Sequence, residues 1–539
     1  MKRTKNRFLP VFLSLWVVFV PCLFAAPTTP LTLHYLGKAG IQASGEGLTA
    51  VELSQRPATK RLLSVALDKL SRAPATLHGI KDDATATSSA DALRPILGDL
   101  LTAESRLELT GTPGQWAFRL AAMVGPEAAG NWDKHLRALA GQMKLGSVED
   151  LKQEGLTGWQ VAPTDHSQGL VFLQGRGWAL VATGPAALPA LAPWQLALAS
   201  TGRPIPKAGP AWIDLHADWK AMGELCACFK GLQLPATRFS VTGEKEMLRT
   251  SATLDFAKPL PVRQEAWNIP TNLINEPLVS FSTCRGLEQI LARSPLIKKL
   301  ALKELPNQAT IWGQSSFRGQ TLMTFPLSQP TNAIVQMGPH LPAALQEVFP
   351  DLPGTVYWLS NKSEIVWRGL PLMSPFIKPY FSASRPYLIA GVVPVLGPTN
   401  PPPPELFAQL KGRDSLLYYG WEITQARLLH HRHYLQLGSI VAGRQGIQTN
   451  DASFVFQQEI QDKLGNCISE LDLSAPAQLT FTRRSAIGLT GLELVLLGRW
   501  IDSPGFPFTF EIPRAPVIRP EDFPKAGKAP PADAPAATP

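Results

Sequence analysis

The stretch that constrains the fold most is Ser105–Met123, where apolar and polar side chains alternate on both sides of a turn. Leu107 and Leu109 alternate with charged neighbours before Gly-Thr-Pro-Gly, and the alternation resumes at Trp116. Period-two alternation about a Gly/Pro turn is typical of a β-hairpin with one buried face. The pattern returns at Thr237–Phe256, and both copies run from a hydroxyl residue and arginine to Thr-Gly. We therefore expect a fold organised around repeated hairpins.

The alternation also predicts which hairpin side chains are buried. They are Leu107, Leu109, Trp116, Phe118 and Leu120 in the first copy and Phe239, Val241, Leu248, Ala252 and Leu254 in the second. Arg106, Glu108, Arg238 and Arg249 should point to the opposite face, because successive strand side chains alternate. A helix at Trp132–Met143 is expected to cover the apolar face of the first hairpin.

The order of elements suggests a repeated unit of strand, helix and hairpin. This order starts near Leu31 and restarts near Ala211, Leu278 and Tyr387. Sequential hairpins form antiparallel sheets, so the pattern predicts an α+β fold with helices covering one face of the sheets. The expected regions are a signal peptide (1–26), three α+β regions (27–208, 209–385 and 386–512) and a disordered Pro/Ala-rich tail (513–539). The second region contains two of the unit starts.

Caps and composition give finer assignments within these regions. Asp91 and Asn131 are expected to cap helices, and Asp218–Phe229 is expected to be helical. Lys81–Ala90 is polar and small and predicts a surface loop, while Pro185–Pro210 is rich in Pro and Ala and predicts a connection. The prolines at 401–404 are expected to run as a stiff connector into a short helix at 405–410, rather than to serve as a polyproline ligand.

The N-terminus has the three parts of a secretory signal. Four basic residues precede an apolar run at 8–24, which ends in Ala25-Ala26, so we expect cleavage near Ala25–Pro27. An uncleaved anchor stays an alternative, since neither Leu23 nor Phe24, the candidates for the position three residues before the cleavage site, is small. Cys22 raises a lipoprotein alternative, which the preceding Val-Pro disfavours. The sequence therefore predicts a periplasmic or secreted protein that meets a membrane only through this segment, if it is retained.

Charge and cysteine content exclude some partners and leave the redox state open. The signal region supplies +4 of the net charge of +9, and no Lys/Arg run follows it, so no nucleic acid partner is expected. Cys226, Cys228, Cys284 and Cys467 remain after signal removal. Cys226 and Cys228 have the wrong spacing for a redox pair and are expected to be small buried apolar side chains; the alternative is one long-range disulfide from one of them to Cys284 or Cys467.

Motifs for catalysis are weak or absent. His430, His431 and His433 form the densest histidine group, but they lack HExxH, and a solvated helix face competes with metal binding. The sequence has no G-x-S-x-G, no S-x-x-K and no glycine-rich phosphate loop, so we assign no catalytic, cofactor-binding or metal residues and expect no cofactor. Whether two carboxylates form a catalytic pair depends on their separation in space, which only the fold shows. The acidic residues in loops or strands that enter this question are Asp351, Glu364, Glu422 and Asp451.

The second half of the chain resembles large uncharacterised exported bacterial proteins with a similar α+β plan. The resemblance is carried by Ile269–Gly286, Pro401–Leu410 and Ile487–Trp500, which contain no active-site motif. It implies a bacterial exported protein and no reaction.

Two functions from different classes follow. The first is a non-catalytic binding or structural protein of the bacterial envelope, which an apolar groove along the sheets would favour. The second is a hydrolase acting on an envelope or extracellular polymer, which a pocket gathering several carboxylates or a His–carboxylate pair would favour.

Overall fold

The computed structural model describes residues 28–511 except 78, 80–81, 163–168, 208, 227–228, 316–319, 349–353, 360–362, 371–372, 382–384, 394–399, 442 and 444–445. The predicted signal peptide at 1–26, the predicted tail at 513–539 and the turn at Asn361-Lys362 lie outside these residues. Within them, no helix is both long enough and apolar enough to cross a membrane.

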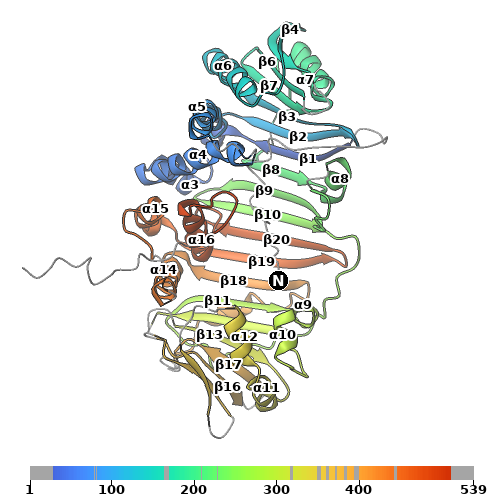
Figure 1. Cartoon of the computed structure of the whole chain (residues 1–539). Coiled ribbons are helices and arrows are strands. Elements are labelled where there is room, and N and C mark those ends of the chain that lie inside the picture. The colour runs from blue at the N-terminus through green and yellow to red at the C-terminus, as the bar shows by residue number, and fades with distance from the viewer. Residues whose placement is uncertain are drawn as a thin grey trace, which may run out of the picture.

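The strands of the described chain form a single antiparallel sheet of 20 strands, which follow one another down the molecule in Figure 1. From one edge of the sheet to the β10–β20 pair, the order is β4 (Val148–Gln153), β5 (Leu156–Val161), β6 (Gly169–Gly175), β7 (Trp178–Gly184), β3 (Gln115–Met123), β2 (Ser105–Thr112), β1 (Thr28–Tyr35), β8 (Ile213–Ala217), β9 (Ala236–Glu244) and β10 (Met247–Asp255). It continues with β20 (Gln478–Ser485), β19 (Asn466–Ala475), β18 (Leu416–Ile423), β11 (Leu278–Arg285), β12 (Gln308–Gln314), β13 (Thr321–Pro326), β17 (Pro386–Gly391), β16 (Phe376–Phe381), β15 (Ile365–Arg368) and β14 (Thr355–Trp358). The predicted α+β class with an antiparallel sheet is confirmed.

The connectivity is the same in both directions from the β10–β20 pair. Outward on one side lie β9, β8, β1, β2, β3, β7, β6, β5 and β4, and on the other side β19, β18, β11, β12, β13, β17, β16, β15 and β14. The two halves meet in the middle of this pair, where Ser251 lies opposite Thr482. The predicted chain regions share this one sheet, because β1 pairs with β8 and β10 pairs with β20.

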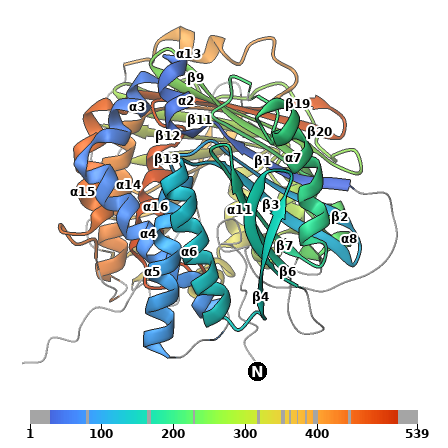
Figure 2. The same ribbon diagram turned by 90° about the horizontal axis from the view of Figure 1, so that it is seen from above.

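Helices cover both faces of the sheet, whereas the sequence predicted one covered face. They are α2 (Gly37–Ser44), α3 (Leu48–Gln55), α4 (Pro57–Leu77), α5 (Asp83–Leu100), α6 (Pro126–Gln142), α7 (Ala187–Thr201), α8 (Trp219–Leu225), α9 (Glu288–Arg293), α10 (Pro295–Lys299), α11 (Pro330–Met337), α12 (Leu341–Val348), α13 (Pro404–Ala408), α14 (Thr424–Val441), α15 (Ala452–Ile460) and α16 (Gly491–Asp502). Figure 2 shows α3 to α6 and α14 to α16 along one side, and α7 lies on the other. Helix α8 packs on the same face as α6, because Phe118 under α8 and Leu120 under α6 point to one side of β3.

Two cores lie back to back at the β4 end of the sheet. Trp132 of α6 packs with Trp159 and Phe172 on one face, and Leu191 of α7 packs with Leu180 on the other. We call these the α6 face and the α7 face. The predicted burial of both faces of the hairpin β6–β7 follows from this double covering.

Several predicted boundaries are wrong because polar or Pro-rich stretches continue helices. Asp82, not Asp91, caps α5, and its carboxylate accepts a hydrogen bond from the Thr85 amide, so most of the expected loop Lys81–Ala90 is helical. Helix α6 begins at Pro126, before the expected cap Asn131, since proline suits the first helical position. The expected connection Pro185–Pro210 contains α7, which buries Leu191, Trp194 and Leu198.

Elements in the second half also differ from the sequence-based expectation. The fourth strand–helix–hairpin order starts at β18, not near Tyr387 as expected. Tyr387 lies in β17, which is the last of a run of strands connected by hairpins. Helix α15 and strand β16 had no counterpart in the prediction. Helix α13 follows the prolines at 401–404 as predicted.

The two signature hairpins have different surroundings. Leu109, Trp116, Phe118 and Leu120 of the first are buried as predicted, and Leu107 is half-buried. Leu120 packs against the α6 core, while Phe118 and Trp116 pack with α8 rather than α6. In the second hairpin only Leu248 of the predicted core is fully buried. The predicted burial is wrong for the half-buried side chains Phe239, Val241, Ala252 and Leu254.

Candidate functional site

The histidines of α14 point to different surroundings. His430 is buried, His431 is half-buried and His433 is exposed, with its Nδ1 2.9 Å from the Leu429 carbonyl oxygen. Burial, helped by the positive charge of Arg427, lowers the pKa of His431 to about 3, so its imidazole is neutral at physiological pH. In the part of the chain that the structure describes, no three His, Cys, Asp or Glu side chains are grouped to hold a metal ion.

The thiols do not form a reactive or disulfide-bonded group. Burial raises the pKa of both Cys284 and Cys467 to about 11, so both stay protonated and weakly nucleophilic at neutral pH. They lie on β11 and β19, opposite Tyr418 and Glu422 of the intervening β18. Two strand steps of ~4.8 Å and four residues of ~3.3 Å place their Cα atoms roughly 16 Å apart, far beyond the ~7 Å limit of a disulfide.

Cys226 bears on two further expectations. It follows the end of α8 in an extended backbone conformation, so it is not helical. It packs with Leu31 and Trp219, close to β1 and several strands away from β19 and β11. Cys226 is buried, as expected, and this position excludes the alternative of a long-range disulfide from Cys226 to Cys284 or Cys467. Cys228 lies outside the described residues.

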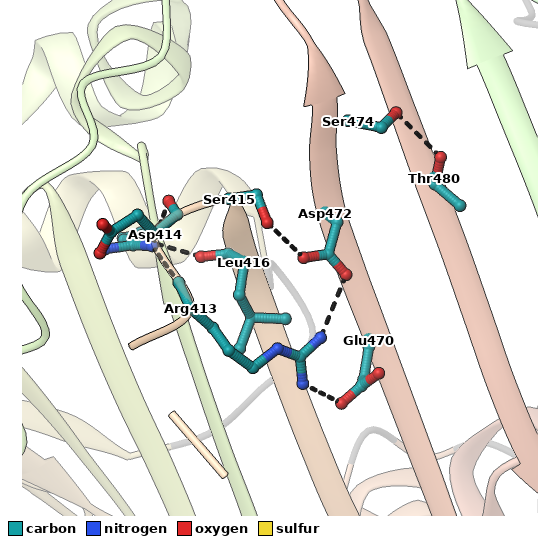
Figure 3. Close-up of polar contacts among 9 residues, drawn as sticks. Arg413, Asp414, Ser415, Leu416, Glu470, Asp472, Ser474 and Thr480 are labelled. Atoms are coloured by element: carbon teal, nitrogen blue, oxygen red, sulfur yellow. Dashed lines mark hydrogen bonds and ion pairs between the residues drawn. The ribbon is translucent and has the colours of Figure 1, made fainter. Parts of the chain in front are cut away.

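A pair of carboxylates does occur on the α7 face of β19, where both accept hydrogen bonds from one arginine (Figure 3). Arg413 of the loop before β18 donates to Glu470 and, at 3.3 Å, to Asp472, while the Ser415 hydroxyl lies 3.0 Å from the other Asp472 oxygen. The hydrogen bond to Glu470 raises the pKa of Arg413, and its positive charge is retained. The two carboxylates accept hydrogen bonds from Arg413 and Ser415 and so bind the loop to the sheet.

The loop that carries Arg413 is fixed from behind by a second arginine. Arg285, 5% exposed, donates to the carbonyl oxygens of Arg413, Asp414 and Leu416 at 2.6–2.9 Å and lies 4.5 Å over the Trp267 ring. Arg285 therefore satisfies the hydrogen-bonding capacity of backbone carbonyl groups in a loop, which indicates a structural role and not a catalytic one.

Another polar cluster lies on the α6 face beneath α14 and α16. Arg483 makes a bidentate pair with Glu493 at 2.6 and 3.0 Å and also donates to Ser469. Glu422 accepts from the amide of Gly491 at 2.7 Å, and desolvation raises its pKa despite nearby Arg427. The cluster anchors the N-terminus of α16, where a carboxylate is stabilised by the helix dipole.

The other acidic candidates do not join these clusters. Asp451 accepts from the amide of Gln448 beside α15, Glu364 lies next to β15, and Asp351 is outside the described residues. A His–carboxylate contact exists elsewhere: His34 Nε2 is 3.4 Å from Glu104, which Arg203 also contacts. Arg203 neutralises that carboxylate, so the pair has the character of a buried ion network.

The feature that stands apart is an apolar face on the central strands, which we call the apolar strip. Strand register aligns one row across eight strands, with a shorter row beside it. The first row is Leu33, Leu215, Phe239, Ala252, Phe481, Leu471, Tyr418 and Cys284, and the second is Leu254, Leu479 and Leu473. All these side chains are half-buried, and they point to the α6 face.

The apolar strip is not part of a packed core. Phe239, Ala252, Phe481 and Leu471 belong to none of the core clusters formed by the described residues, although Leu215 touches the cluster around α8. Helices approach the same strands beside it. Gly47, which precedes α3, lies against Trp212 and Leu248, and the α14–α16 region covers the Arg483 end.

The opposite face of the same strands has the opposite chemistry. Its side chains are comparably exposed, yet they are polar and joined by cross-strand pairs such as Arg238–Asp255 and Arg249–Glu244. Ser251, Thr253, Thr480 and Thr482 fill the positions between them. Solvent exposure alone therefore does not account for the apolar composition of the strip. The sequence analysis predicted three of its residues, Phe239, Ala252 and Leu254, to be core and missed their partial exposure, for which alternation gives no signal.

Comparison of the chain with protein family models, with curated proteins and with solved structures finds no match.

Proposed function

We propose that the chain is a non-catalytic binding protein of the bacterial envelope, exported to the periplasm or secreted, and that the apolar strip is its binding surface. The observation that carries the proposal is the contrast between the two faces of β9, β10, β20 and β19. Apolar side chains that stay partly exposed on one face, while the partly exposed side chains of the other face are polar, are typical of an interaction surface.

The proposal includes a scaffold role for the repeated units. Strand, helix and hairpin recur with the same pairing from β1, β8, β11 and β18, and we infer that these are copies of one unit. Because the halves meet at β10–β20, the strip spans their junction and receives strands from both.

The hydrolase alternative has less support. The thiols of Cys284 and Cys467 are protonated, Glu470 and Asp472 pair with Arg413, and Glu104 pairs with Arg203. These groups serve as hydrogen-bonded structural contacts, whereas a general base must be free to accept a proton.

The binding role is tested with anilinonaphthalene sulfonate, a dye whose fluorescence rises on apolar surfaces. We expect saturable binding to the native protein that Phe481→Asp reduces at least tenfold. Thr482→Asp is the matched control, because it introduces the same charge one residue away on the opposite face. Circular dichroism and the unfolding midpoint establish that both variants are folded. Equal binding by the two variants would overturn the assignment.

Export is tested by N-terminal sequencing of the mature protein. We expect a start near Ala25–Pro27, and a protein retained in the inner membrane with Met1 intact would contradict cleavage.

A further inference from the structure

We infer that β4, the strand at one end of the sheet, pairs with β4 of a second copy of the chain in an antiparallel, two-fold symmetric dimer. The inference does not depend on the proposed binding role of the apolar strip, which lies on the central strands. It follows from the free edge of β4, from the positions of the neighbouring helices and from the charges along the strand.

The outer edge of β4 is free within the described part of the chain. The strand pairs with β5, and beyond that ladder no backbone group of Val148–Gln153 hydrogen bonds to another described segment. Figure 1 shows β4 at the end of the sheet. The first three side chains of the strand and that of Lys152 are exposed. Such an edge presents a row of unpaired N–H and C=O groups with which another strand can pair.

The helices leave room for a second copy at this edge. Helix α6 packs mainly against β6 and β7, and α7 packs mainly against β3, β6 and β7, so β4 lies outside the strands that these helices share. In the dimer, five inter-strand steps of ~4.8 Å separate β6 from β6 of the second copy, which is roughly 24 Å. A helix is ~10–12 Å in diameter, so equivalent helices of the two copies do not collide.

Strand alternation assigns the charged side chains of β4 to faces. Asp150 points to the α6 face, where its carboxylate accepts a hydrogen bond from Arg137 of α6 at 2.8 Å. Lys152 follows two residues later on the same face and forms no ion pair within the described chain. Leu151, between them, points to the opposite face and packs against the core under α7.

Two-fold symmetry restricts how two copies of β4 can pair. Opposite residues of antiparallel strands point to the same face, so the axis passes beside one residue, which then lies opposite itself. Centring the pair on Glu149, Asp150 or Lys152 places like charges directly opposite each other, which destabilises a strand pair. Centring it on Val148 or Gln153 uses only one end of the strand. The register centred on Leu151 is the one that uses the strand and avoids these like-charge contacts.

In the register centred on Leu151, opposite charges meet across the two-fold axis. Asp150 lies opposite Lys152 of the second copy, and Lys152 lies opposite Asp150 of the second copy, so this pair forms twice on the α6 face. On the α7 face Leu151 meets its own copy, and Glu149 meets Gln153 of the second copy, whose amide is a hydrogen-bond donor. Charged residues on an edge strand commonly discourage pairing. On β4 they instead select one register, and its partner is a second copy of the chain.

The size of the contact defines the strength to expect. Pairing over residues 149–153 extends for roughly 17 Å along the strand. A contact of this length is smaller than the ~800 Å² per partner of a standard interface. We therefore expect a reversible dimer whose population rises with protein concentration, and which added salt weakens because exposed charges are screened.

Sedimentation equilibrium over a series of protein concentrations at low salt tests the inference by charge exchange. Asp150→Lys and Lys152→Asp should each raise the dissociation constant of the dimer at least tenfold, because each variant alone places like charges opposite each other twice. An equimolar mixture of the two variants should dimerise again, since every lysine of one then faces an aspartate of the other. Lys411→Asp, the same charge change at an exposed turn before β18, is the control and should leave the dimer unchanged.

Several outcomes would overturn the dimer. They are a native chain that stays monomeric throughout the series, and a mixture that stays monomeric like the separate variants although circular dichroism shows both to be folded. Assemblies that grow beyond a dimer would indicate pairing of β4 with β14 at the other end of the sheet, and would overturn the two-fold arrangement.

Failure of this inference is distinguishable from failure of the proposed function. Phe481→Asp should leave the dimer intact, because Phe481 lies on the central strand β20, and Asp150→Lys should leave dye binding intact. A dimer that Phe481→Asp dissociates and Asp150→Lys does not would assign self-association to the apolar strip and overturn the pairing of β4.

Discussion

Truncation of Phe118 to alanine tests the packing of the hairpin around which the fold is organised. Phe118 is 8% exposed and lies on β3 within the core that includes Leu109 and Trp219. Its ring meets that of Trp116 edge to face, with centroids 5.8 Å apart. The side chain therefore has both apolar burial and a specific aromatic contact to lose.

The expected magnitude follows from these contacts. Loss of a fully buried large apolar side chain removes ~1.5–3 kcal/mol of transfer free energy, and the aromatic pair adds ~0.5–1.5 kcal/mol. The rigid sheet on one side and α8 on the other leave little room to close the cavity, which adds a further term. We expect Phe118→Ala to lower the free energy of unfolding by ~3–5 kcal/mol.

Guanidinium unfolding, followed by tryptophan fluorescence and circular dichroism, measures the loss. Phe381→Ala is the control, because Phe381 ends β16 with 66% of its surface exposed and should cost well under ~1 kcal/mol. Comparable losses for the two variants would show that Phe118 does not lie in a packed core. A midpoint shift confined to one of the two probes would show that the hairpin unfolds separately from the sheet.

Two more predictions concern buried charge. Glu108, 3% exposed, accepts from Arg119, so Glu108→Ala should cost ~3–5 kcal/mol by leaving a buried cation, and adding Arg119→Met should recover part of that loss in the same unfolding assay. His431, whose pKa falls from 6.5 to about 3 on folding, binds a proton more readily when unfolded. The contribution of neutral His431 to the free energy of unfolding is therefore complete above pH 6.5 and is lost as the pH falls toward 3. His431→Leu should flatten the stability–pH profile in that window, and exposed His433→Leu should not; identical profiles would refute the burial of His431.

Local patterns in the sequence were enough to predict most strands and the α+β class. The alternation at Leu107–Leu109 and Trp116–Leu120 predicts a hairpin because a pleated strand places every second side chain on one face. The apolar arms of β6 and β7 likewise indicate burial on both faces, which α6 and α7 provide. Helix starts were less predictable, since Asp82 and Pro126 compete with equally good capping residues at Asp91 and Asn131.

The candidate site depended on contacts that alternation does not encode. Phe239 and Ala252 show the same pattern as Phe118, yet they are only half-buried and belong to none of the core clusters of the described residues. Glu470 and Asp472 alternate along one strand as a catalytic pair would, but both accept hydrogen bonds from Arg413, more than fifty residues away in sequence.

The sequence by itself determined that this chain forms hairpins, which side chains share a strand face, and that no familiar catalytic motif is present. Only the tertiary structure decided that the hairpins join into one sheet, that its halves meet at β10–β20, and that the apolar row there stays half-open. The physical reason is that periodicity is a property of neighbouring residues, whereas the burial of a face depends on which distant segment covers it.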